Sequence, residues 1–209
     1  MVLIMSFIGH NLSCDRGGRH VFDQVNFNVP EGAALIISGP NGSGKTSLLR
    51  LAAGLVRPVT GRLTWEGMCV FEDPGLHASR LHFVGHLDAI KPALTVEANL
   101  QFWVRLQGRG RPHIVEEALE RLGLSMVAKV PANTLSAGQR RRLSLARLAT
   151  NRLPLWCLDE PSVGLDHDAN SILNDLINEH QAGNGRVLLA THHNFELTNS
   201  VELRLVGEP

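Results

Sequence analysis

The segment with the clearest chemical pattern is a glycine-rich run that ends in a lysine and a threonine. It reads Gly39-Pro40-Asn41-Gly42-Ser43-Gly44-Lys45-Thr46 and fits the spacing G-x-x-x-x-G-K-[ST]. Glycines let such a loop turn tightly, so that successive backbone N–H groups face a phosphate, and the following helix adds the partial positive charge of its N-terminus. In this pattern Lys45 reaches the terminal phosphates and the Thr46 hydroxyl ligates Mg²⁺. The run therefore predicts a nucleotide-phosphate site.

Two adjacent carboxylates, Asp159 and Glu160, end the apolar run 155–158. Such a run is typical of a buried parallel strand, and ligands of parallel sheets bind at the carboxyl ends of the strands. We expect Asp159 to hold the Mg²⁺ shell and Glu160 to orient or deprotonate the water that attacks a γ-phosphate. Without the phosphate loop, the same pair would indicate an ordinary solvated turn.

A second anion-binding helix end is predicted at Leu135-Ser136-Ala137-Gly138-Gln139. Ser136 can cap the helix that follows, and the exposed N–H groups beside a glycine can bind an anion. One nucleotide hardly needs two such sites. The pentapeptide taken alone is also consistent with a commonplace serine-capped helix.

The elements that must position these residues follow from hydrophobic periodicity. The phosphate loop stands between an apolar strand and a helix, and Gly54 suits the left-handed conformation after a helix end. Helical spacing dominates residues 89–150, which we interpret as a helical lobe inserted into one domain that spans residues 1–209. The expected strands are 2–12, 21–29, 33–38, 81–85, 155–158, 187–190 and 203–206. The expected helices are 45–53, 96–106, 114–122, 139–150 and 167–180.

These motifs, in this order, resemble the ATP-binding-cassette ATPase family. The resemblance rests on the phosphate loop, Leu-Ser-Ala-Gly-Gln, Leu-Asp-Glu-Pro at 158–161, Gly-Leu-Asp at 164–166 and Thr191-His192, and it covers essentially the whole chain. It implies an α/β fold: a P-loop NTPase core with an N-terminal antiparallel β portion and an inserted helical lobe. ATP and Mg²⁺ are the implied cofactors.

The resemblance also implies roles for single residues. Ser136 and Gly138, with Gln139, would cap the ATP bound by a second ATPase chain, so that two chains form a nucleotide-sandwich homodimer. Asp166 would belong to the loop that links the two sites. His192 would contact the γ-phosphate and hold the attacking water, whereas His193 is expected to be a bystander.

The chain departs from the family pattern in two places. Where most members carry an aromatic residue that stacks on adenine, this chain has Asp15-Arg16-Gly17-Gly18. Arg16 can stack its guanidinium plane on the base or can be a solvated turn residue. The glutamine that usually ligates Mg²⁺ and senses the transporter is replaced by Leu87, which cannot ligate a metal; His86 and Asp88 are the candidate substitutes.

A second resemblance rests on residues 84–96 and 135–143, on Ala-Arg-Leu at 146–148, on Trp156 and on the short length. These features closely resemble the ATPases of cytochrome c maturation, the CcmA family of haem exporters. This resemblance implies membrane partners resembling CcmB, CcmC and CcmD, and a functional link to the haem-loaded chaperone CcmE. The alternatives are the ATPase of another small exporter and a non-hydrolysing, ATP-gated interaction module. A cassette protein of DNA repair or translation would carry a coiled-coil insertion or two cassettes, and we find neither.

Charge composition argues against nucleic acid as a partner, because Lys+Arg and Asp+Glu both number 20. Arg140-Arg141-Arg142 with Arg147 could form a nucleic-acid patch, but we interpret them as a solvated helix face. Phe102 and Trp103 indicate lobe core or a transporter-facing surface rather than a platform for stacking bases.

The three cysteines are dispersed, which argues against a disulfide framework or a zinc site and favours a reducing compartment. No apolar run approaches the roughly 20 residues that span a bilayer, and residues 1–8 lack the basic leader of a signal or transit peptide. We expect a peripheral protein on the cytoplasmic face of the bacterial inner membrane, with the mitochondrial inner membrane as the alternative.

Overall fold

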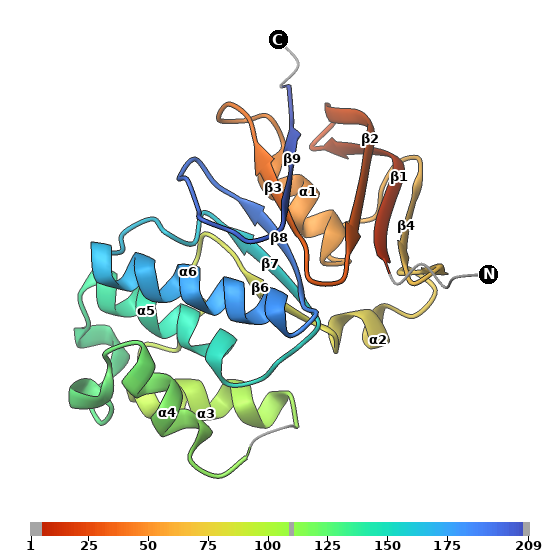
Figure 1. The fold of residues 1–209 in the computed structure, drawn as a ribbon. Helices are drawn as coiled ribbons and strands as arrows, with labels where there is room; N and C mark the ends of the chain where they lie inside the picture. The colour runs from red at the N-terminus through yellow and green to blue at the C-terminus, as the bar shows by residue number, and fades with distance from the viewer. Residues whose placement is uncertain (1–5, 109–110, 207–209) are drawn as a thin grey trace. The chain divides into compact units, whose positions relative to one another are not determined.

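The computed structural model describes residues 6–108 and 111–206 (Figure 1). They fall into two units. The first unit contains the described residues of Met1–Phe83, Leu153–Glu160 and His180–Pro209, and the second those of Val84–Arg152 and Pro161–Glu179. The helical lobe expected at residues 89–150 lies within the second unit. Residues 2–5 of the first expected strand lie outside the described residues.

An antiparallel sheet opens the first unit. Its strand order is β2-β1-β4-β5. The hairpin of β1 and β2 turns at Gly17-Gly18, where both residues have positive φ, and strand β1 continues beyond the expected end at residue 12. A two-residue turn of this kind suits glycine, which adopts positive φ without steric cost. The strands are β1 (Ser6–Arg16), β2 (Arg19–Pro30), β4 (Arg62–Trp65) and β5 (Met68–Cys69).

The second sheet of this unit has the order β6-β7-β8-β3-β9, and β3 pairs in parallel with both β8 and β9, as β7 does with β8. Strands β7 and β8 are buried along their whole length, as expected for apolar runs inside a parallel sheet. The expected last strand is present but begins three residues earlier and ends at Arg204, because this edge strand exposes most of its side chains and apolar patterning does not mark its start. The strands are β6 (Leu81–Val84), β7 (Leu155–Asp159), β8 (Arg186–Ala190), β3 (Ala34–Ser38) and β9 (Ser200–Arg204).

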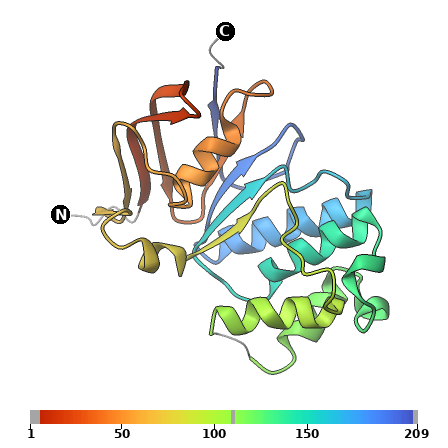
Figure 2. The same ribbon diagram turned by 180° about the vertical axis from the view of Figure 1, so that it is seen from behind.

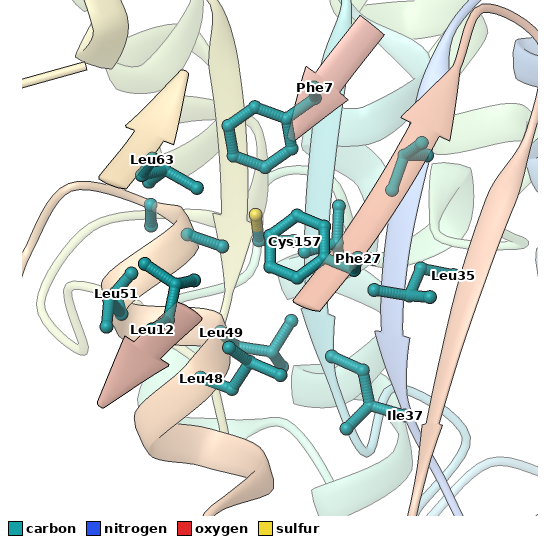
Figure 3. Packing of buried hydrophobic residues seen from close by; sticks show 14 of the residues in the cluster. Phe7, Leu12, Phe27, Leu35, Ile37, Leu48, Leu49, Leu51, Leu63 and Cys157 are labelled. Carbon is teal, nitrogen blue, oxygen red and sulfur yellow. The ribbon is translucent and has the colours of Figure 1, made fainter. Parts of the chain in front are cut away.

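Helix α1 (Lys45–Ala52) packs in the core of the first unit, between side chains of the two sheets (Figure 3). Its C-cap is Ala53, and Gly54 follows with φ +74°, which confirms the predicted helix end. Since both faces of α1 are covered, its N-terminus is held in a fixed place relative to the strands. The buried cluster includes Phe7, Leu12, Phe27, Leu35, Ile37, Leu48, Leu49, Leu51, Leu63 and Cys157.

Helices α3, α4 and α5 of the second unit pack against one another (Figure 2). The expected helix at 139–150 begins two residues earlier and ends at Ala146, and a 3₁₀ turn, Arg147–Ala149, continues it. No helix among residues 6–108 and 111–206 has the length and apolar composition needed to cross a membrane. The remaining helices are α2 (Pro74–Ala78), in the first unit, and α3 (Val96–Leu106), α4 (Ile114–Arg121), α5 (Ala137–Ala146) and α6 (His167–Ala182).

Candidate functional site

The glycine-rich loop connects β3 to α1, as its spacing predicts. Gly39 has φ +140°, and a Cβ atom there would clash with the backbone oxygen of Leu205. Gly44 has φ +97°, and a Cβ atom there would lie 2.7 Å from Cγ1 of Val21. No described side chain caps the N-terminus of α1, and its first turn carries no acidic residue. The free N–H groups and the positive end of the helix dipole can therefore act on an anion.

Lys45 is largely buried at the start of α1 and points its ammonium group back into the loop. Nζ donates to the carbonyl oxygens of Gly39, at 2.8 Å, and Pro40, at 3.2 Å. It also lies 3.1 Å from Nε2 of His192. An ammonium group has donors only, so Nε2 is the acceptor in this contact and the imidazole proton is on Nδ1. The predicted phosphate-binding lysine and the predicted γ-phosphate histidine thus lie in direct contact.

The two predicted metal ligands also meet. Thr46 Oγ1 donates to Asp159 Oδ2 at 2.9 Å, and Asp159 is 3% exposed at the end of β7. Hydroxyl and carboxylate oxygens are ligands that Mg²⁺ accepts alongside phosphate oxygens and water. The pair therefore fits the donor set that the cation requires.

Glu160 has φ +46°, a left-handed conformation that is uncommon for a residue with a Cβ atom. Its N–H donates to the carbonyl of Ala190 at 2.8 Å, which ties this bend to the end of β8. Oε1 lies 3.6 Å from His192 Nε2, and the N–H of His192 donates to Oε2 at 3.4 Å. Backbone strain of this kind is often stored at functional sites. The first unit thus brings Lys45 and Glu160 to the same histidine.

The second predicted anion-binding helix end lies in the second unit. Ser136 Oγ accepts from the N–H of Gln139 at 3.2 Å, and Gln139 Oε1 accepts from the N–H of Ser136 at 2.9 Å. This reciprocal capping box confirms that Ser136 caps α5. At Gly138 a Cβ atom would lie 3.2 Å from the carbonyl oxygen of Gly164. Asp166, two residues on, accepts from the N–H of Ala169 at 2.9 Å and so helps to start α6.

The residues at the two positions that depart from the family pattern differ in exposure and in their contacts. Arg16 is exposed beside the Gly17-Gly18 turn, and its stacking on adenine stays a prediction. Leu87 is 83% exposed, and His86 is also exposed. Asp88 behaves differently, because its Oδ1 lies 3.2 Å from Nη1 of Arg141. Of the two candidate substitutes for the missing glutamine, Asp88 therefore already has a cationic partner.

The prediction of a solvated arginine face on α5 was wrong for Arg141 and Arg147, which are 6% and 4% exposed. The Arg147 guanidinium lies 4.7 Å from the ring centroid of Trp103. The pKa of Arg147 is lowered to about 10, mainly by burial and also by the charge of Arg141, while Asp88 opposes the shift. The group stays charged at neutral pH, so the second unit contains buried positive charge that the sequence prediction placed in water.

Comparison with known proteins identifies the family. Residues 22–163 match the family described as ABC transporter. The chain belongs to this family. Among curated ABC ATPase relatives, it is 48% identical to the cytochrome c biogenesis ATP-binding export protein CcmA of Rhodospirillum rubrum, over 95% of this chain and 85% of the relative. The CcmA protein of Paramagnetospirillum magneticum is 47% identical, over 96% and 94% of the two chains.

Solved ABC transporter structures share the fold. One ATP-binding subunit superposes with a TM-score of 0.81 at 23% identity, over 90% of this chain and 79% of the other. An ABC transporter ATP-binding protein from Pyrococcus furiosus gives 0.83 at 22% identity, over 96% and 97%. These findings confirm the predicted ABC ATPase fold and the resemblance to CcmA. The chain is an ATP-hydrolysing ABC transporter subunit.

Proposed function

We propose that the chain hydrolyses MgATP with residues of the first unit. Lys45 and the loop Gly39–Gly44 bind the phosphates through an ammonium group and backbone N–H groups. Thr46 and Asp159 hold Mg²⁺, which neutralises phosphate charge when it is bound. Glu160 orients or deprotonates the attacking water, and His192 contacts the γ-phosphate.

One observation carries this proposal: the chain brings the end of β7 to the start of α1. The 2.9 Å bond between Thr46 and Asp159 joins the phosphate loop to the carboxyl edge of the parallel sheet. Glu160, the next residue, is turned by its left-handed backbone to face His192, which in turn contacts Lys45. A solvated acidic turn would have no reason to converge with a phosphate loop in this way.

The second unit supplies the contact to another chain in this proposal. The start of α5 presents the positive end of its dipole beside Ser136, Gly138 and Gln139, and the N–H of Gly138 lies outside the capping box. These residues would cap the ATP of a second ATPase chain in a head-to-tail homodimer. Closure of the dimer then depends on nucleotide, since ATP supplies contacts that neither chain makes alone.

For the pathway, we propose cytochrome c maturation, with ATP hydrolysis coupled to haem export or to release of the haem-loaded chaperone CcmE. The names of relatives that are 44–48% identical support this assignment. The proposed partners are membrane proteins resembling CcmB, CcmC and CcmD. The chain would then lie on the cytoplasmic face of the bacterial inner membrane.

The test is a Glu160→Gln variant, which keeps the shape of the side chain but removes the base. We expect it to retain ATP and to lose turnover by roughly 10²–10⁴-fold. The matched control is Glu72→Gln, the same change at a side chain that is 72% exposed in the same unit. Wild-type turnover in Glu160→Gln would contradict the assignment of the base.

The same variant tests the pathway. Purified from native membranes with ATP present, it should bring down membrane proteins resembling CcmB and CcmC. Recovery of a different permease would favour the alternative of another small exporter and leave the ATPase assignment in place. A chain that binds ATP but never hydrolyses it, even in its complex, would be the ATP-gated module that the missing glutamine suggests.

A further inference from the structure

Arg141 makes three contacts with the second unit from the middle of α5. Its Nη1 atom donates to the carbonyl oxygen of Gly85 at 3.0 Å and pairs with Asp88 Oδ1 at 3.2 Å. Its Nε atom donates to the carbonyl oxygen of Pro161 at 3.2 Å. The side chain is 7% exposed and that of Asp88 is 28% exposed. The guanidinium group is therefore held between two backbone carbonyls and a carboxylate.

Arg141 connects helix α5 to two segments that lie far from it in the sequence. Gly85 and Asp88 belong to the loop after β6, where related ATPases carry the glutamine that Leu87 replaces here. Pro161 directly follows Glu160 in the chain. Arg141 itself lies on α5, five residues after Ser136. One buried side chain on α5 thus bonds to two other segments of the same unit.

Burying a guanidinium group is costly unless its donors are satisfied and a counter-charge is near. Asp88 supplies that charge, and the two carbonyls satisfy donors whose directions are fixed by the planar group. Lysine would keep the charge but could not reproduce this geometry, because its single ammonium group cannot reach divergent acceptors along fixed directions. A role limited to solubility or to surface charge would not require these contacts.

We propose that Arg141 is a positioning residue for ATP hydrolysis, and that its ion pair with Asp88 links the loop 85–88 to the start of α5. Through Pro161 it fixes the backbone that follows Glu160; through Asp88 it passes movement of the loop to the helix that carries Ser136. Asp88 thereby replaces the missing glutamine as a mechanical link and not as a metal ligand. This inference rests on the proposed function.

The experiment uses the full chain, purified with its membrane partners, in the variants Arg141→Lys and Asp88→Asn. The control is Arg142→Lys on the same helix, whose Nη1 atom lies 3.5 Å from the carbonyl oxygen of Leu122. We measure the turnover of ATP, the affinity for a fluorescent ATP analogue, and the melting temperature. Turnover should fall about 10-fold or more in Arg141→Lys, since small displacements of catalytic groups are costly.

Affinity for the analogue should stay near the wild-type value in both variants, whereas the melting temperature should fall, because each change leaves buried donors or charge unsatisfied. Arg142→Lys should behave as wild type. Combining Arg141→Lys with Asp88→Asn should cost little more than either change alone, because both break the same link. Unchanged turnover in Arg141→Lys overturns the inference. A loss of turnover that is accompanied by an equal loss of affinity for the analogue would also overturn it, because it would indicate a purely structural role.

Glu160→Gln, measured in parallel, separates this inference from the proposed function. If it loses turnover while Arg141→Lys does not, only the role of Arg141 fails. If Glu160→Gln keeps turnover, the proposed base fails, and the reason for fixing the segment after it fails as well.

Discussion

His77 offers a test of how the helix that carries Lys45 is anchored. It lies on α2, is 2% exposed and stacks on Phe7 with ring centroids 5.9 Å apart. Its Nε2 atom is 2.9 Å from the carbonyl oxygen of Ala52, the last residue of α1. A carbonyl only accepts, so Nε2 carries the proton, and Nδ1 has no hydrogen-bond partner among the described residues. Protonation of the ring would therefore place an unpaired charge inside the core.

Burial lowers the pKa of His77 below its ordinary value of 6.5; the bond to Ala52 opposes this shift and nearby Arg80 adds to it. The unfolded chain then binds the proton more readily than the folded one. The stability that His77 contributes is complete above the unfolded pKa and is lost as the pH falls through the folded pKa. The loss is at most about 1.4 kcal/mol for each pH unit in that window.

The perturbation is His77→Phe, which keeps an aromatic ring against Phe7 but removes both the titration and the bond to Ala52. At pH 8 the variant should be less stable by about 1 kcal/mol, the net value of one hydrogen bond. As the pH falls from 8 to 5 the wild type alone loses the stability that depends on a neutral His77. The difference between the two proteins should therefore shrink, with a change of at most about 2 kcal/mol by pH 5.

Urea titrations followed by tryptophan fluorescence, at several values between pH 5 and pH 8, measure this difference. The matched control is His167→Phe at a side chain that is 98% exposed, which should track the wild type at every pH. A difference between wild type and His77→Phe that stays constant across this range would refute the reasoning, because it would mean that His77 titrates equally in the folded and unfolded chains.

Two further substitutions test packing before β8 and the cap at the start of α5. Gly185→Ala would place a methyl group against the imidazole of His180, whose ring centroid lies 3.9 Å from that of Trp156. We therefore expect the free energy of unfolding in urea to fall by about 1–3 kcal/mol and tryptophan emission to change. Unchanged emission would show that His180 can move aside. Ser136→Ala removes the capping box and should lower the free energy of unfolding by about 1 kcal/mol. Ser136→Asn should restore most of this stability in the same assay. Equal stability of all three proteins would contradict the capping role.

Sequence reasoning succeeded where local pattern and local structure coincide. The phosphate loop, the Ser136 cap and the left-handed Gly54 depend on residues within a few positions of one another, and the structure has all three. It misplaced the bounds of β9, because an edge strand is defined by its pairing with β3 and not by buried side chains of its own. The contact between Lys45 and His192 joins residues 147 positions apart, and no pattern within either segment predicts it.

The buried arginines show a different reason for failure. Arg141 belongs to a run of arginines that we interpret from the sequence as a solvated helix face, yet it stands at helical spacing with Ser144, Leu145 and Leu148, all of which are buried. A helix buries a stripe of positions three and four apart, whatever residue types occupy them. The signal was therefore present in the spacing, and the charge obscured it. A charged residue within such a stripe must have a partner, because the free-energy cost of desolvating an unpaired charge would keep it out of the core. Here Asp88 is that partner, in the loop that lacks the family's glutamine.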